Sequence, residues 1–282
     1  MNKKIFFLIV SFALFALVAQ AQLPDGMMAS QSYIDTIRAN YKNENAIPFD
    51  VNTVRSSFRI PVRVFIVRNI KGLSGVTTTD ISGSLKTANG YFKNAGMEFF
   101  IDSVAYVDDY NYSYVVRNRL NKELLNRYLT PSRINLFVVD SIYLNNQKMY
   151  GFTYFPDQAD SNIIYLNKKY AAGISLTTML GHYMGLLSTH EYGGGQELAD
   201  ESNCGETGDF ICDTYADPGL FNQVIDTCKY IGTGRDNSGK YFIPSVANIM
   251  SDSPDKCRCI LSPMQYRRIY YYFRKYRLSR LF

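Results

Sequence analysis

The stretch Thr178-Met-Leu-Gly-His-Tyr-Met-Gly-Leu-Leu-Ser188 decides the fold of this chain. It lies at the end of a helix that we predict from about Ser175 to Gly185, and it contains His182. The 282 residues include only one other histidine, His190. A site that needs three imidazoles therefore cannot form, and a metal bound near His182 would need other donors.

Upstream of this stretch, the sequence alternates between strand and helix patterns. Alternating or continuous apolar residues predict four strands, over Ile60–Ile66, Met97–Val104, Ile134–Val139 and Ile163–Leu166. Helical spacing is found over residues 81–92 and 120–129. Strands and helices in alternation predict a mixed α/β sheet domain.

Downstream of residue 190, regular patterns give way to sequence rich in Gly, Asp and Cys. All five cysteines lie here, and we expect disulfides among Cys204, Cys212, Cys228, Cys257 and Cys259. The chain ends in a predicted aromatic and basic helix, Pro263–Phe282. We expect its aromatic side to pack on the domain and its charges to face water, and a membrane-surface role is the alternative.

The first residues predict export. Lys3 and Lys4 form a basic start, Ile5–Val18 is apolar, and Ala19-Gln20-Ala21 is a small-x-small cleavage site. The apolar run is too short for a permanent membrane anchor, and no later segment is apolar enough to cross a membrane. We therefore expect residues 1–21 to be a signal peptide and the protein to be periplasmic, cell-surface or secreted. A retained N-terminal helix is the alternative.

The overall composition does not predict a nucleic-acid partner. The formal net charge is +5, which is too small a bias to predict phosphate binding. No pattern in the sequence indicates an oligomeric state.

The opening stretch resembles the H-E-x-x-H-x-x-G-x-x-H signature of the metzincin zinc peptidases, and in particular that of the pappalysin (cytophagalysin) family. In that signature three His hold Zn²⁺ and the Glu polarises a zinc-bound water. Two later stretches also resemble the family. Asn203–Pro218 looks like its segment after the zinc helix, and Ala247–Asp252 looks like its Met-turn, with Met250 under the site. The resemblance covers roughly residues 58–282.

Only part of the family pattern is present. His182 and Gly185 match it, but four functional positions differ: Thr178 at the first His, Met179 at the Glu, Ser188 at the third His, and Asp252 at a Tyr that stabilises the oxyanion. Neutral hydroxyls bind zinc weakly, and a methionine side chain cannot exchange a proton. His182 would thus be a remnant of the metal-binding set, and we expect no zinc there. We also expect the protein to be an inactive homologue of these peptidases and not an enzyme.

The resemblance implies a metzincin-like α+β fold in two subdomains. Residues 58–190 would form an upper subdomain of twisted mixed sheet and helices that carries the degenerate zinc helix. Residues 191–282 would form a lower, irregular, disulfide-stapled subdomain with the Met-turn and a final helix. Residues 22–57 read as a polar, irregular lead-in segment.

The resemblance also implies a peptide cleft. Substrates of metzincins lie antiparallel to an edge strand, here expected to be Ile163, Ile164, Tyr165 and Leu166, with His182 and Met250 beside it. Our leading hypothesis is an inactive peptidase homologue that binds a peptide or protein there. One alternative is an active metalloendopeptidase with an unusual metal-ligand set. Another is a structural or surface assembly component.

Two further features follow from the resemblance alone. It implies the disulfides Cys204–Cys228 and Cys212–Cys257 with Cys259 free, and an exchange of Cys257 for Cys259 is the alternative. Asp209, the Cys212 carbonyl and Thr214 match positions that bind calcium in some family members. The alternative there is a loop in which Asp side chains bond to nearby amides.

Overall fold

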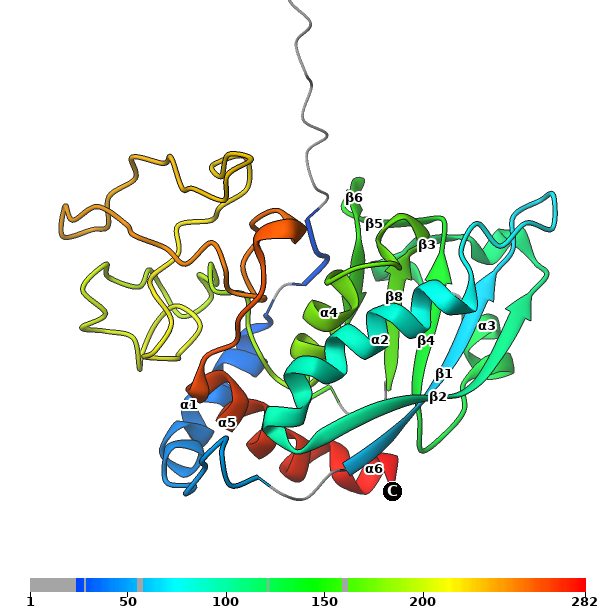
Figure 1. The fold of residues 1–282 in the computed structure, drawn as a ribbon, viewed down its shortest axis with the longest axis horizontal. Coiled ribbons are helices and arrows are strands. Elements are labelled where there is room, and N and C mark those ends of the chain that lie inside the picture. The colour runs from blue at the N-terminus through cyan, green and yellow to red at the C-terminus, as the bar shows by residue number, and fades with distance from the viewer. Residues whose placement is uncertain (1–23, 28, 55–57, 121, 159–161) are drawn as a thin grey trace, which may run out of the picture.

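A five-stranded sheet with helices on its faces forms the larger part of the fold (Figure 1). The computed structural model describes residues 24–27, 29–54, 58–120, 122–158 and 162–282, and the expected signal peptide lies outside them. The helices are α1 (Gln31–Asn45), α2 (Thr78–Phe92), α3 (Lys122–Tyr128), α4 (Ser175–Tyr183), α5 (Pro263–Tyr272) and α6 (Leu278–Leu281). None of the helices in the described part of the chain has the length and apolarity needed to span a bilayer.

The large sheet has the strand order β2-β1-β4-β8-β7. Its strands are β1 (Phe58–Val67), β2 (Met97–Val107), β4 (Ile134–Val139), β8 (Ile163–Asn167) and β7 (Gly151–Thr153). The first four run parallel, and β7 runs antiparallel to β8. A second sheet contains β3 (Tyr114–Val116), β5 (Ser141–Leu144) and β6 (Gln147–Met149). The predicted mixed α/β class, four predicted strands and the helices at α2, α3 and α4 are confirmed.

The prediction that Ile163–Leu166 is an edge strand is wrong. Strand β8 lies between β4 and β7, and all five of its residues are buried. The edge beside α4 is instead β7, whose three residues are too few to show a sequence period. Ile163, Ile164, Tyr165 and Leu166 therefore belong to the interior of the sheet and not to a cleft.

Aromatic rings cross one face of the sheet from strand to strand. Phe65 on β1 stacks on Phe137 with ring centroids 4.7 Å apart, and Phe137 stacks on Tyr165 at 5.1 Å. Phe152 on β7 continues the row against Tyr165 at 4.9 Å. These residues are cross-strand partners, so the ring contacts favour this register and fix the short edge strand to the core.

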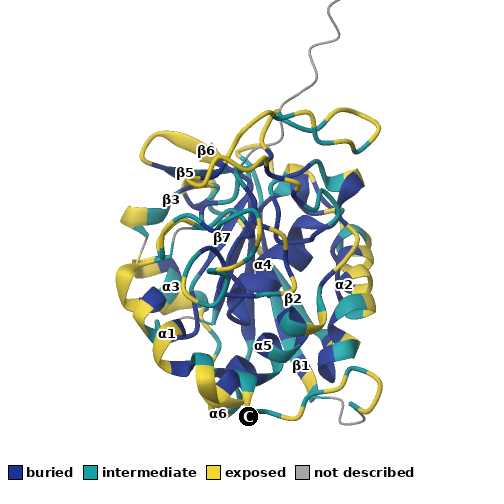
Figure 2. Ribbon diagram, turned by 90° about the vertical axis from the view of Figure 1, so that its left-hand side faces the viewer, coloured by how far each residue is buried: buried dark blue, intermediate teal, exposed yellow. Residues whose placement is uncertain are grey.

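The opposite face of the sheet packs against α2 and α4. Inward-facing residues of β1 contact the apolar side of α2, whose start is fixed by a capping box between Thr77 and Asp80. Figure 2 shows buried residues concentrated along the sheet and α4, with exposed residues on the outer sides of α1, α2 and α3. Helix α4 is buried along its whole length, which keeps its histidine out of bulk water.

Residues 191–262 contain no α-helix and no named strand, as the loss of regular patterning after residue 190 predicted. The expected cysteine pairing is wrong: the disulfides are Cys204–Cys212 and Cys228–Cys257. Residues 203–212 fold back through consecutive turns, so Cys212 meets Cys204 before the chain reaches Cys228. Cys259 is free and exposed, as expected.

Residues 22–57 were expected to be irregular, but they contain α1. This helix buries Tyr33, Ile34 and Ile37 against α5 and Phe155, while most of its other residues are polar. Only three of its fifteen residues are both apolar and buried, which is a weak periodic signal and explains why the helix was missed.

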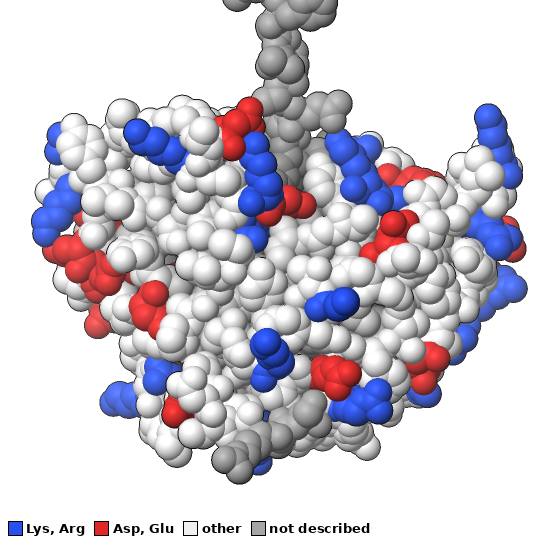
Figure 3. Space-filling view, in the orientation of Figure 1, with Lys and Arg blue, Asp and Glu red and all other residues white. Residues whose placement is uncertain are grey.

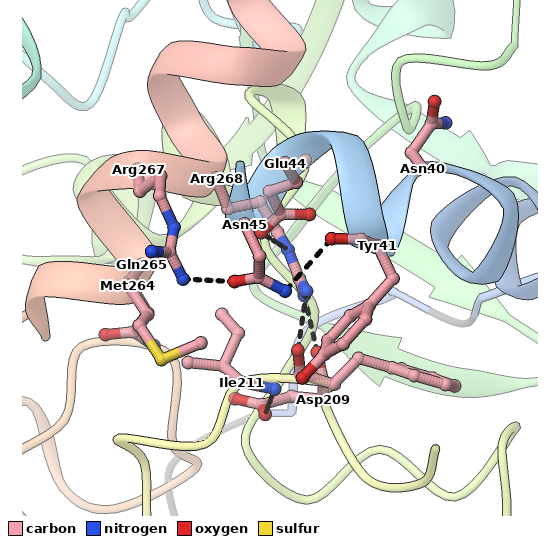
Figure 4. A network of polar contacts seen from close by, with 12 residues as sticks. Asn40, Tyr41, Glu44, Asn45, Asp209, Ile211, Met264, Gln265, Arg267 and Arg268 are labelled. Carbon is pink, nitrogen blue, oxygen red and sulfur yellow. Dashed lines mark hydrogen bonds and ion pairs between the residues drawn. The ribbon is translucent and has the colours of Figure 1, made fainter. Parts of the chain in front are cut away.

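The fixed point between α1 and α5 is a buried ion pair (Figure 4). Arg268 donates from Nε to Glu44 Oε1 at 2.9 Å, and both side chains are buried. Its Nη1 and Nη2 donate to the carbonyls of Asp209 and Phe210. The prediction that the charges of the last helix face water is therefore wrong for Arg268, and also for Arg277, which is fully buried.

We expect Glu44→Ala to lower the free energy of unfolding by about 3 to 5 kcal/mol, because it leaves the buried Arg268 guanidinium without its anion. The matched control is Asp35→Ala on the exposed side of α1, where the surface pair with Arg38 contributes about 1 kcal/mol or less. Equilibrium urea unfolding measures both. Equal losses in the two variants would show that the buried pair does not hold α1 to α5.

Candidate functional site

Helix α4 ends over a methionine and then turns sharply. A Cβ at Gly181 would lie 2.6 Å from Met250 Sδ, so a larger residue at 181 would require the Met250 side chain to move. Gly185 has a φ of +104°, a conformation that favours glycine, and its carbonyl accepts a hydrogen bond from Tyr33 at 2.8 Å. The structure thus places Met250 against the end of the helix that carries His182.

Both ring nitrogens of His182 have partners. Nδ1 lies 2.8 Å from the Leu186 carbonyl oxygen, which can only accept, so Nδ1 carries a proton. Nε2 lies 3.2 Å from Asp25 Oδ2. Burial acts to raise the pKa of Asp25, but the hydrogen bond and the charge of His182 hold it below its usual range. Asp25 is therefore a carboxylate, and the side of His182 that faces the cleft is covered by an anion.

Asp25 reaches His182 because residues 24–27 line the edge of the sheet. The amide of Tyr150 donates to the Pro24 carbonyl at 3.0 Å, and the amide of Gly26 donates to the Gly151 carbonyl at 2.7 Å. The segment runs in the same direction as β7. In Figure 1 it passes between the irregular part of the chain and the sheet. The chain's own N-terminal segment thus occupies the cleft beside β7.

A hydrogen bond from Arg117 and a steric limit at Gly26 also define how this segment is bound. Arg117 donates a hydrogen bond to the Gly26 carbonyl. A Cβ on Gly26 would lie 3.1 Å from the Gly151 carbonyl oxygen and 3.2 Å from Phe152 Cβ, so this position is tight for any side chain. These contacts therefore fit a segment in which an acidic residue is followed by a very small one.

The residues at the expected zinc positions do not fit a zinc set. Thr178 Oγ1 donates to the Ile249 carbonyl at 3.1 Å and accepts from the Arg258 guanidinium at 2.9 Å. The buried guanidinium of Arg258 thus contacts Thr178, the position expected for the first zinc ligand. Met179 is fully buried, and a Cβ at Gly151 would lie 3.0 Å from its Sδ, so it packs beneath the edge strand. Ser188 lines a separate cavity beyond His182.

Two cavities flank the N-terminal segment. A small one, about 110 Å³, is lined by Asp25, Tyr150, His190, Asp252 and Arg258 among others. A larger one, about 390 Å³, is lined by Met27, Ala29, Ser188, Glu191 and Tyr192 among others. Asp252 accepts from the amides of Leu220 and Phe221, so the expected Tyr position holds a carboxylate fixed by backbone donors.

A group of buried oxygens lies in the expected calcium region. Asp209 accepts from the Ile211 amide at 2.9 Å and from Thr214 Oγ1 at 3.1 Å, so the alternative of a loop held by an Asp side chain is also realised. Glu197, which the sequence analysis missed, is buried, and neither of its carboxylate oxygens has a hydrogen-bond partner in the described part of the chain. Cys212 is held in its disulfide.

Burial makes the carboxyl groups of Glu197 and Asp209 costly to ionise. Burial, together with the nearby charge of Asp209, raises the pKa of Glu197 to about 9. Burial also raises the pKa of Asp209 to about 7, against the opposing charge of Arg268. Hard oxygen donors of this kind suit Ca²⁺, and calcium binding in this region stays a prediction.

No protein-family model matches the sequence, and no curated protein does. Solved structures match the fold. Mirolysin in complex with compound 9 is 17% identical, with a TM-score of 0.54 over 78% of this chain and 92% of that chain. A mutant of promirolysin from Tannerella forsythia is 15% identical, with a TM-score of 0.55 over 89% of this chain and 93% of that one. Both are metzincin-type metallopeptidases. The fold of this chain is metzincin-like.

These comparisons contradict our expectation that the chain is not an enzyme. The proteins that share its fold are metallopeptidases, and the likeness covers most of both chains. The expectation of inactivity is therefore wrong, and what the comparisons show is a peptidase-like fold.

We expect Glu197 to make stability fall with pH in a calcium-free buffer. Its pKa is raised from 4.5 to about 9 on folding, so its contribution is complete below pH 4.5 and is lost as the pH rises through 9. Glu197→Gln should flatten this fall between pH 7 and 9, and Ca²⁺ should stabilise the parent chain more than the variant. Thermal unfolding against pH measures this, with the exposed Glu98→Gln as control. Identical pH profiles for the parent and Glu197→Gln would contradict the assignment.

Proposed function

We propose that this protein is an exported, pappalysin-like member of the metzincin group that binds an extended peptide along β7, over His182. The observation that supports this most directly is the seat of residues 24–27, which already bond to this edge. A backbone that pairs with an exposed strand edge is a general way of binding peptides. In the free protein, the chain's own segment holds the place of the ligand.

The seat suggests which peptides bind. The Tyr150 amide and the Gly151 carbonyl offer backbone hydrogen bonds that any extended segment can use. His182 would select a carboxylate, because Asp25 is the group that it holds now. The tight space at Gly26 would select glycine at the next position. We infer that ligands carry an Asp-Gly-like pair, with the following side chains in the cavity beside Tyr192.

Two features support export. Disulfides persist in oxidising compartments, and this chain has two. The first 21 residues have the pattern of a signal peptide, and cleavage after Ala21 would make Asp25 the fourth residue of the mature protein. The segment in the cleft would then be a short free end, which a second peptide can displace more readily than an internal loop.

A second candidate function is metal-dependent peptide hydrolysis in the same cleft. The shared fold with metallopeptidases favours it. The potential metal ligands His190, Asp217 and Asp252 favour it as well. Cleavage of a bound peptide that requires added metal would distinguish hydrolysis from binding alone.

The binding proposal is tested with a labelled peptide of residues 22–30 and the variant Gly26→Val. The added side chain should expel the chain's own segment, so the variant should bind the peptide roughly tenfold tighter than the parent by fluorescence anisotropy, since the tethered competitor is gone. A peptide with Asn in place of Asp25 should bind more weakly.

Gly83→Val is the matched control, because it adds the same side chain to an open helix surface. Its peptide affinity should equal that of the parent. A folded Gly26→Val variant that binds no peptide would overturn the proposal.

A further inference from the structure

We propose that His190, Asp217 and Asp252 form a site for a divalent transition metal in the cleft, separate from His182. One ligand atom from each side chain lies within 4.8 Å of the other two. One imidazole with two carboxylates is a mixed nitrogen and oxygen set that suits Zn²⁺ or Mn²⁺. The inference stands independently of peptide binding along β7.

The three residues come from separate segments that are tied together. His190 follows the turn after α4, Asp217 ends the loop after Cys212, and Asp252 follows Met250. The Thr189 amide donates to the Met250 carbonyl at 3.1 Å, and Thr189 Oγ1 donates to Asp217 Oδ2 at 2.6 Å. Residue 189 therefore connects all three segments directly beside His190.

The carboxylates are already oriented by backbone donors. Gly219 donates to Asp217 Oδ1 at 2.8 Å, and the amides of Leu220 and Phe221 donate to the two oxygens of Asp252. Hydrogen bonds of this kind hold metal-binding carboxylates in place, and each oxygen keeps a lone pair for a metal. The geometry is that of a supported ligand pair more than of a free acidic surface.

The third ligand would be the imidazole of His190. His190 Nδ1 is buried and has no hydrogen-bond partner among the described residues, and it lies 3.9 Å from Asp252 Oδ1. Ligand atoms at about 2.0 to 2.2 Å from one metal lie roughly 3 to 3.5 Å apart, so the three groups need to close by about 1 Å. A side-chain rotation of His190, which is 29% exposed, can supply that movement.

The surroundings leave space and negative charge for a cation. The cavity of about 110 Å³ touches His190 and Asp252, so water can complete the coordination. Asp25 also lines this cavity and adds a second carboxylate, beside that of Asp252, to its wall. The one guanidinium that lines it, Arg258, is already paired with Asp255 and hydrogen-bonded to Thr178. A metal held here would face the same cleft as the segment 24–27.

The test is a titration of the chelator-treated full chain with Zn²⁺ and, separately, with Mn²⁺, by isothermal titration calorimetry. Excess Ca²⁺ in the buffer competes for any oxygen-only site, such as the Glu197 region. The parent should bind one transition metal per chain. His190→Ala and Asp252→Asn should each bind at least tenfold more weakly, with circular dichroism showing that both remain folded.

His182→Ala is the matched control, since it removes the other histidine and none of the proposed ligands. It should keep the stoichiometry and affinity of the parent. X-ray absorption of the zinc-loaded parent should show one imidazole among oxygen ligands, which does not depend on any variant. A spectrum with two imidazoles, loss of binding in His182→Ala alone, or no stoichiometric binding to the parent would overturn the proposal.

Discussion

The buried guanidinium of Arg268 is the interaction on which the rest of the structure depends. A charge without water is tolerated only when its donors are satisfied, and Arg268 uses one on Glu44 and two on the carbonyls of Asp209 and Phe210. These partners belong to the N-terminal helix and to the disulfide-bonded region. One side chain thus joins α1, α5 and the irregular part of the chain.

The position of α1 then sets the content of the cleft. Tyr33 on this helix stacks on Phe155 with ring centroids 4.3 Å apart, and Phe155 meets the ring of His182 edge-on at 5.8 Å. Tyr33 also bonds to the Gly185 carbonyl. Only a few residues separate this anchored helix from the segment 24–27, so Asp25 is held near His182 by chain length as well as by its own contacts.

On the face shown in Figure 3, acidic and basic side chains are interspersed over a mostly uncharged surface.

The sequence predicted what depends on local periodicity, and it missed what depends on distant contacts. The long strands and α4 follow from apolar patterns, whereas the expected place of Met250 came from the family resemblance. Strand β7 is too short to show a period, and α1 has too few apolar residues. The Asp25–His182 contact joins residues 157 positions apart, so no local pattern could indicate it. Cysteine spacing likewise cannot fix connectivity, because the turns that bring Cys204 to Cys212 are set by backbone hydrogen bonds.

The central claim is that residues 24–27 occupy a peptide-binding edge that can be emptied and refilled. Hydrogen exchange at the Tyr150 amide tests it most directly, because this amide donates to the Pro24 carbonyl. We predict slow exchange in the parent, faster exchange in Gly26→Val, and slow exchange again when the peptide of residues 22–30 is added. Equally slow exchange in the parent and in the variant, or no recovery with peptide, would contradict the account.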